Sequence, residues 1–263
     1  MKFSPYSISK SECYVSCPKH FDLKYIQKIK VPFKANVALY KGNYIHQIIE
    51  NNYDYNTEFK TNEVFKETDK ERAASLTKIF EDSDLGKFYK TKAHNPTAKH
   101  EEKFGFKIVN GGLEVCGYWD KKCWYRGAID FNFKENGIIF NVDWKSGKDK
   151  SQDENFGITQ SKMYAIYLML KNPHVNVIIS KFVFIEHCTE KTIIYRRENM
   201  KNYIKDFYDI TSKIENATQY PPKTSALCNW CDYQQHGHCT SFIEENERNT
   251  RESNNLLNSK INF

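Results

Sequence analysis

The stretch IIFNVDWKSG at residues 138–147 has the pattern of a buried β-strand that ends in charged side chains. Apolar residues fill most of its first half, and Ser146-Gly147 is typical of a tight exit from a strand. Because side chains alternate along a strand, Asp143 and Lys145 would point to one face and Trp144 to the other. The stretch therefore predicts a core strand with a carboxylate and an ammonium group side by side at its end.

This pair of charges suits hydrolysis of a phosphodiester, because the carboxylate can hold a divalent cation and the lysine can stabilise developing negative charge. An acidic residue two positions before a lysine is nevertheless a common pattern. It also occurs at residues 22–24, 58–60, 101–103 and 120–122. The copy at residues 143–145 differs from these four because it ends an apolar strand.

A second carboxylate lies thirteen residues earlier, where Asp130 ends the run Gly127-Ala128-Ile129-Asp130. Glu135-Asn136-Gly137 supplies a hairpin turn between the two apolar runs. Such a hairpin can bring Asp130 beside Asp143, and paired carboxylates suit Mg²⁺, which prefers oxygen ligands. The alternative is that Asp130 is a surface residue of an ordinary hairpin.

The rest of the chain predicts helices first, then a cluster of strands, then mixed elements. We expect helices at residues 10–25, 36–53, 68–80, 156–170 and 198–217, and strands at 103–108, 113–118, 124–133, 138–145, 175–186 and 192–196. This order indicates an α/β or α+β core with an N-terminal helical segment.

We expect a single domain over residues 1–242. It would comprise a mainly helical part at 1–95, a catalytic core at 96–217 and a cysteine-rich loop at 218–242. After it, we expect a weakly ordered or helical tail at 243–263.

Composition excludes several classes of protein. Apolar residues make up 40% of the 263-residue chain and aromatic residues 15%, which is ample for a core and excludes global disorder. No stretch approaches the ~18 apolar residues of a membrane helix, and the start lacks the apolar core of a signal peptide. We therefore expect a cytoplasmic protein without a membrane segment.

The formal net charge of +6 fits a nucleic-acid partner, although a solvated basic surface explains it equally well.

Three of the eight cysteines lie in one C-terminal loop, at Cys228, Cys231 and Cys239. Three thiolates leave a tetrahedral metal site one ligand short. The fourth ligand could be local, since His236 and His238 lie in the same loop and would complete a zinc site. It could also be distant. We expect Cys13, Cys116, Cys123 and Cys188 to be ordinary buried or half-buried thiols, with Cys13 as the one competitor among them for the distant position.

Three further residues carry little information when each is read alone. His46 follows Gly42 on the expected helix at residues 36–53, and a lone histidine there is more often packed or solvent-facing than a ligand. Gln160 and Tyr164 are four residues apart and share one face of the expected helix at residues 156–170.

Taken in order, these motifs resemble the RecB-like branch of the PD-(D/E)XK nucleases. The motifs are Gly42-x-x-x-His46, Gly127-Ala128-Ile129-Asp130, Asp143-Trp144-Lys145-Ser146-Gly147 and Gln160-x-x-x-Tyr164, and the resemblance covers about residues 7–240. It implies a restriction-endonuclease-like core, a central mixed sheet flanked by helices, and a DNA exonuclease that uses Mg²⁺ or Mn²⁺. The substrate could be single-stranded DNA, duplex ends, or both.

The resemblance also implies roles for individual residues. His46, Asp130, Asp143 and the backbone carbonyl of Trp144 would bind the metal, and Lys145 would be catalytic. Gln160 and Tyr164 would support the site or the DNA. The family tends to carry a further acidic residue on an earlier strand, and here Glu101 and Glu102 both compete for that position.

The segment Ser16-Cys17-Pro18-Lys19-His20-Phe21 resembles the N-terminal motif of the iron–sulfur subset of these nucleases. The resemblance implies that Cys17 joins Cys228, Cys231 and Cys239 around a [4Fe–4S] cluster. The seven residues between Cys231 and Cys239 make a longer gap than is common in that subset.

The sequence contains no Gly-x-x-x-x-Gly-Lys-Ser/Thr loop, so we expect a stand-alone exonuclease in phage or prokaryotic DNA recombination. A recombinase, a single-strand-binding protein or another processing factor would be a compatible partner. The alternatives are a CRISPR-adaptation nuclease and a catalytically silent DNA-binding module with a structural Fe–S or zinc site. A tail or assembly protein with a structural zinc would leave the ordered motifs unexplained.

Overall fold

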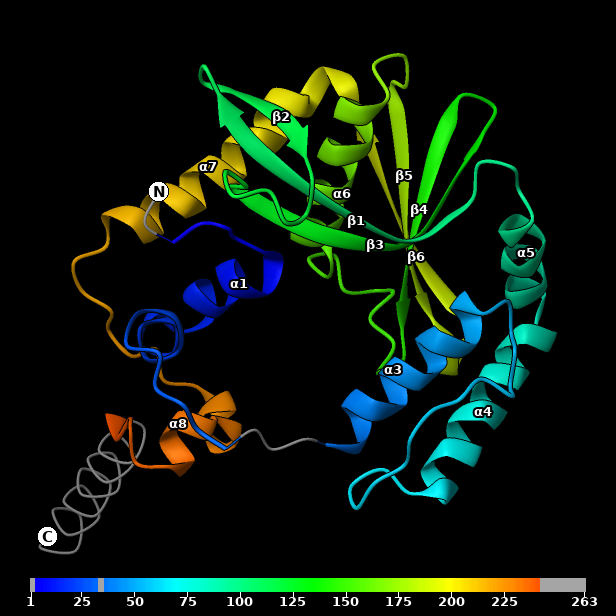
Figure 1. The fold of residues 1–263 in the computed structure, drawn as a ribbon, viewed down its shortest axis with the longest axis horizontal. Coiled ribbons are helices and arrows are strands. Elements are labelled where there is room, and N and C mark those ends of the chain that lie inside the picture. The colour runs from blue at the N-terminus through cyan, green and yellow to red at the C-terminus, as the bar shows by residue number, and fades with distance from the viewer. Residues whose placement is uncertain (1–2, 33–35, 242–263) are drawn as a thin grey trace, which may run out of the picture. The chain divides into compact units, whose positions relative to one another are not determined.

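The computed structural model describes residues 3–32 and 36–241 (Figure 1). The chain divides into two compact units, which we call the sheet unit and the cysteine unit. The sheet unit comprises Met1–Ile8 and Ala35–Thr211, and the cysteine unit comprises Ser9–Lys34 and Ser212–Phe263. The tail expected at residues 243–263 lies outside the described residues.

A six-stranded sheet in the order β2-β1-β3-β4-β5-β6 forms the centre of the sheet unit. All neighbouring strands are antiparallel except β4 and β5, which are parallel. The strands are β1 (Lys99–Val109), β2 (Gly112–Cys116), β3 (Tyr125–Glu135), β4 (Ile138–Lys145), β5 (Val177–Phe184) and β6 (Thr189–Arg196). The expectation of a central mixed sheet flanked by helices is confirmed.

The hairpin between β3 and β4 has the turn that its sequence predicts. Asn136 and Gly137 have φ angles of 50° and 77°. Positive φ at both central residues is characteristic of the two-residue turns that match the twist of paired strands, and asparagine followed by glycine adopts it readily. This turn sets the register of the two strands that carry Asp130 and Asp143.

Helices cover both faces of the sheet (Figure 1). On one face, α3 (Val37–Glu50), α4 (Glu67–Asp82) and α5 (Asp84–Ala93) pack against Phe131, Phe133 and Trp144. On the other face lies α6 (Ile158–Lys171), whose Tyr167 ring stacks on Phe104 with the ring centroids 4.3 Å apart. The last long helix, α7 (Met200–Asn216), begins in the sheet unit and ends in the cysteine unit.

The cysteine unit is built from short elements. They are α1 (Ile8–Ser16), α2 (Pro18–Phe21), a π-helical turn (Asp22–Ile26), a 3-10 turn (Ala226–Trp230) and α8 (Asp232–Gln235). Two more 3-10 turns, Ile185–His187 and Arg197–Asn199, lie in the sheet unit. No helix among the described residues is long and apolar enough to cross a membrane.

The expected continuous helix over residues 10–25 is wrong, because it breaks at Cys17. This residue is extended, with φ −157° and ψ 105°, and α2 starts at Pro18. A proline disfavours helical geometry in the residue before it and is well placed at the first position of a new helix. The break leaves Cys17 at the N-cap of α2.

Helix α5 was not expected from the sequence. A single residue, Ser83, separates it from α4, and the Ser83 hydroxyl accepts a hydrogen bond of 3.1 Å from the Gly86 amide. A β-carbon on Gly86 would lie 1.9 Å from the backbone oxygen of Phe80. The close turn between α4 and α5 therefore requires glycine at this position.

We predict that Gly86→Ala destabilises the protein by ~1–3 kcal/mol or more, because the clash is with backbone atoms and cannot be relieved by a side-chain rotation. Alanine is intrinsically the better helix former by ~1 kcal/mol, so the sign of the effect tests the close approach itself. Urea denaturation followed by circular dichroism measures it. Gly112→Ala is the control, since its β-carbon would meet only the Val109 oxygen at an ordinary 3.6 Å.

Candidate active site

Asp130 and Asp143 lie where the ladder between β3 and β4 ends. The paired residues run from Glu135 opposite Ile138 to Phe131 opposite Val142. Beyond that point Asp130 Oδ2 accepts a hydrogen bond of 2.9 Å from the Trp144 amide. We call this point, where the ladder ends beyond Phe131 and Val142, the fork. It places the carboxylates of Asp130 and Asp143 together, as the hairpin argument predicts.

Asp143 is 3% exposed and lies among polar side chains from β4 and α6. Its Oδ2 is 2.5 Å from Lys145 Nζ. Its Oδ1 accepts hydrogen bonds from Gln160 Nε2 at 2.6 Å and from the Tyr164 hydroxyl at 3.3 Å. Gln160 also donates to the Tyr164 hydroxyl at 2.7 Å and accepts from Lys145 Nζ at 3.3 Å. The four residues form one connected network.

The start of α6 positions this network. Gly157 caps the helix with φ 75°, and a β-carbon there would lie 2.3 Å from the ring of Phe182 on β5. Glycine lets the helix begin directly against the sheet, and Gln160 and Tyr164 then project from its first two turns toward Asp143.

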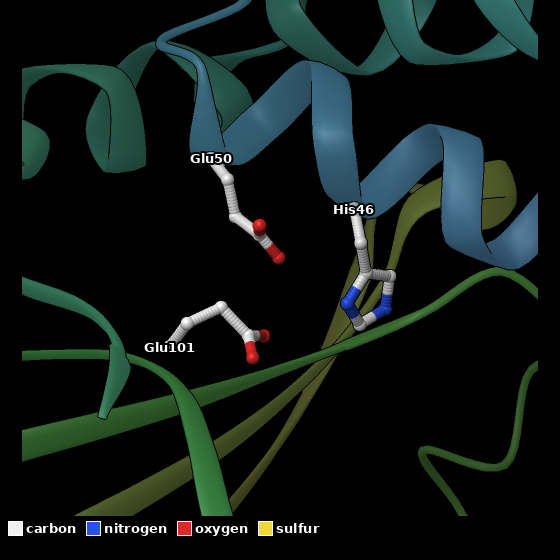
Figure 2. Close-up of side chains that lie close together, drawn as sticks. All are labelled: His46, Glu50 and Glu101. Atoms are coloured by element: carbon white, nitrogen blue, oxygen red, sulfur yellow. The ribbon is translucent and has the colours of Figure 1, made fainter. Parts of the chain in front are cut away.

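A second group of ligands approaches from the other side of the fork. The side chains of His46, Glu50 and Glu101 have ligand atoms within 4.8 Å of one another. Figure 2 shows His46 and Glu50 projecting from α3 toward Glu101 of β1. His46 and Glu50 are one helical turn apart, which places them on one face of α3.

His46 connects the two groups. Its Nε2 is 3.0 Å from the Trp144 carbonyl, and its Nδ1 is 3.7 Å from Asp130 Oδ2. The carbonyl expected from the resemblance to bind metal therefore faces the imidazole. Burial lowers the pKa of His46, which favours the neutral form that can bind a metal.

Of the two competing acidic residues, Glu101 lies at the site and Glu102 does not. Glu102 accepts hydrogen bonds of 2.9 Å from the Tyr167 hydroxyl and from Asn132 Nδ2, and it pairs with Lys171. Since His100 is opposite Phe131 and Glu102 opposite Ile129, Glu101 lies across from Asp130. Its φ of 46° is unusual within a strand, and such strained residues cluster at functional sites.

Glu50 is a candidate site residue that the sequence did not indicate. The available signal was its position four residues after His46 on the same helix. Burial, followed by the nearby charge of Glu101, raises the pKa of Glu50 to about 7. The residue helps to line a hollow of about 560 Å³ together with Gly42, Asn43, His46 and Glu101.

The electrostatics of the site fit a bound divalent cation. Burial, and then the charge of Asp143, raise the pKa of Asp130 well above its ordinary value. Asp143 Oδ2 is buried and accepts no hydrogen bond from the described residues, although it contacts the Lys145 ammonium. Carboxylate oxygens with one imidazole form a donor set suited to Mg²⁺ or Mn²⁺.

The four cysteines expected to form a cluster all belong to the cysteine unit and line one small hollow. The Lys223 amide is 3.5 Å from Cys17 Sγ, and the Ser225 amide is 3.4 Å from Cys228 Sγ. Cys231 Sγ is 4.0 Å from His20 Nδ1. The remaining member, Cys239, follows α8.

The competing ligands are placed differently. His236, His238 and Cys13 are not among the residues that line this hollow. The His236 ring Nδ1 is 2.7 Å from the Asp232 carbonyl, and burial raises the pKa of the Cys13 thiol to about 11. Of the candidate fourth ligands, only Cys17 lines the hollow with the three C-terminal cysteines.

Comparison with known proteins agrees with this geometry. The profile of the PD-(D/E)XK nuclease superfamily matches residues 5–236. A crystal structure from Eubacterium rectale, described as a candidate exonuclease, has a TM-score of 0.53 and 13% identity, and the match covers 88% of each chain. The structure of a protein named SSO0001 matches with a TM-score of 0.33 and 15% identity, covering 86% of this chain and 90% of its own. No curated protein matches the sequence.

We predict that Glu101→Gln weakens binding of Mn²⁺ at least tenfold, because it removes a charged oxygen ligand from the group with His46 and Glu50. Titration calorimetry with MnCl₂ measures the affinity. Glu102→Gln is the matched control: it alters the neighbouring residue of the same strand, whose carboxylate is held by Lys171 and Tyr167. Equal losses in the two variants would contradict the assignment of Glu101.

Proposed function

The chain belongs to the PD-(D/E)XK nuclease superfamily, and from this premise we propose that it is a DNA exonuclease of the RecB-like type that uses Mg²⁺ or Mn²⁺. Membership makes the chain a hydrolytic nuclease. The proposed role in phage or prokaryotic DNA recombination and the exonucleolytic mode go beyond membership. The description of the Eubacterium rectale structure supports the mode.

The observation that carries the proposal is the arrangement of Asp130, Asp143 and Lys145 at the fork between β3 and β4. His46, Glu101 and the two aspartates would hold the metal, with the Trp144 carbonyl as a further candidate. When bound, the cation would supply Lewis-acid stabilisation of negative charge on the scissile phosphate. The buried carboxylates supply the compensating charge.

The other side chains of the network act on position and charge. Lys145 lies between Asp143 and Gln160, so its ammonium group is fixed where it can stabilise the negative charge that develops on the phosphate. Gln160 donates to Asp143 and accepts from Lys145, which couples the orientations of the two. Tyr164 donates a further hydrogen bond to the same carboxylate oxygen of Asp143.

For the cysteine unit we propose a [4Fe–4S] cluster held by Cys17, Cys228, Cys231 and Cys239. Two observations support this proposal. The four thiols line one hollow, and backbone amides are directed at two of their sulfur atoms. A single zinc ion with Zn–S bonds of ~2.3 Å requires sulfur atoms ~3.8 Å apart. Among the described residues, no three of these thiols lie within 4.8 Å of one another, which favours a wider cluster over zinc.

DNA cleavage tests the proposed enzyme. We expect Mn²⁺-dependent shortening of end-labelled linear DNA, no cleavage of covalently closed circles, and complete inhibition by EDTA. Asp143→Asn keeps the shape of the side chain and removes its charge, so activity should fall below detection. Asp149→Asn, in the exposed loop after β4, should cleave normally.

The lysine provides a finer test in the same assay. Lys145→Ala should lower the rate by ~10²–10³ while DNA affinity changes little, because the loss concerns the transition state. A wild-type protein that binds DNA and never cleaves it would instead identify a silent binding module.

The cluster predicts a second set of outcomes. Cys17→Ser should remove the iron and the visible absorbance at roughly 400 nm of an anaerobic preparation, because one thiolate ligand is lost. Cys188→Ser, in the sheet unit, should leave both unchanged. If Cys17→Ser keeps its full metal content while His236→Ala or His238→Ala loses it, the site is a local zinc centre.

A further inference from the structure

An exposed tryptophan stands in the connection between β2 and β3, at residues 117–124. Trp119 is 78% exposed. The guanidinium carbon of Arg126 is 4.6 Å from the centre of the Tyr118 ring and 5.2 Å from that of the Trp119 ring. The two rings meet edge to face with their centroids 4.8 Å apart. An aromatic pair with a stacked cation thus lies at the surface.

The loop that carries Trp119 has an ordered backbone. The Asp120 amide donates to the Gly117 carbonyl and the Cys123 amide to the Asp120 carbonyl, each at 3.0 Å. The Asp120 carboxylate accepts a further hydrogen bond of 2.7 Å from the Lys122 amide. A tryptophan held in this way loses little conformational freedom when it binds a partner.

The strand register connects this loop with the acidic site. Arg126 and Asp130 are four residues apart on β3 and therefore lie ~13 Å apart along the strand. Lys103 of β1 is opposite Ala128, between Arg126 and Asp130 along the strand, and is exposed. A β-carbon on Gly105, which is opposite Arg126, would lie 3.0 Å from the Gly117 carbonyl. The loop therefore lies against β1 at Gly105, beside Arg126 of β3.

The surface combines flat rings with positive charge. Lys121 and Lys122 are exposed in the same loop, and Lys103 and Arg126 lie along β1 and β3 between this loop and Asp130. Aromatic rings beside positively charged side chains suit a nucleic acid whose bases are accessible for stacking and whose phosphates carry negative charge. Single-stranded DNA meets this description, whereas a duplex hides its bases in the stack.

We propose that Trp119 stacks on a base of single-stranded DNA while Arg126 and Lys103 contact its phosphates, guiding the strand into the site at Asp130. The inference rests on the proposed function, because it concerns the substrate of that site. At ~3.4 Å per stacked nucleotide, the ~13 Å between Arg126 and Asp130 corresponds to about four nucleotides. Trp119 is thus a residue that selects the single strand.

Fluorescence anisotropy with a fluorescein-labelled 16-nucleotide oligothymidylate, in EDTA, tests this inference. Trp119→Ala should raise the Kd about 5- to 150-fold, the range expected for loss of one base stack, and Trp119→Phe should restore most of the affinity. Binding of a blunt 16-base-pair duplex should change less than about twofold. Phe88→Ala on α5, a second exposed aromatic residue beside a lysine, should leave both affinities unchanged.

The outcomes separate this inference from the proposed function. An unchanged Kd of Trp119→Ala for the oligothymidylate overturns the inference, and so does an equal loss of affinity for the duplex. Failure of the wild-type protein to cleave DNA with Mn²⁺ overturns the nuclease and leaves the binding comparison intact, because EDTA prevents turnover. Arg126→Gln should also lower the slope of log Kd against log salt by about 1 if it contacts one phosphate.

Discussion

The burial of like charges at the end of the β3–β4 ladder is the constraint on which the site depends. Asp130 and Asp143 are held together by the strands, and burial makes each charge expensive. Two local groups reduce the cost: the Trp144 amide, which donates to Asp130, and the Lys145 ammonium beside Asp143. The surrounding fold has to hold the carboxylates in place against their repulsion.

Side chains on the face of the sheet opposite Asp143 hold strand β4 in place. Trp144 packs among Phe80, Tyr89 and Phe131, with ring centroids between 5.2 and 6.2 Å from its own. Because side chains alternate, the residue between Asp143 and Lys145 anchors the strand in this aromatic cluster while its neighbours face the site. Helix α3 contributes to the same cluster through Ile45, Ile48 and Ile49 and so brings His46 and Glu50 to the fork. One packed core thereby positions candidate ligands from three elements.

The sequence could predict what depends on strand alternation and on turn chemistry. The opposite directions of Asp143 and Trp144 follow from the period of a strand, and the hairpin follows from Asn136-Gly137. It could not decide between Glu101 and Glu102, because the positive φ of Glu101 and the pairing of Glu102 with Lys171 arise only in the folded chain. Glu50 was missed because a charge near the end of a helix is usually a solvated one. The break at Cys17 was overlooked although Pro18 gave a local signal for it.

The cysteine unit has a physical consequence that does not depend on catalysis. It is built from two segments that lie before and after residues 35–211 in the chain, and its four thiols come from both of them. Joining Cys17 to Cys228 through one metal centre would close a loop of about two hundred residues, which restricts the unfolded chain by ~5 kcal/mol on the chain-entropy relation for cross-links. Such a restraint acts on the unfolded state, so loss of the metal would lower the stability of the protein without altering any ligand of the acidic site. The carboxylates of Asp130 and Asp143 differ from this proposed centre, because their burial opposes folding and the role proposed for them is chemical. The proposed metal centre and the candidate acidic site are thus built from separate residues.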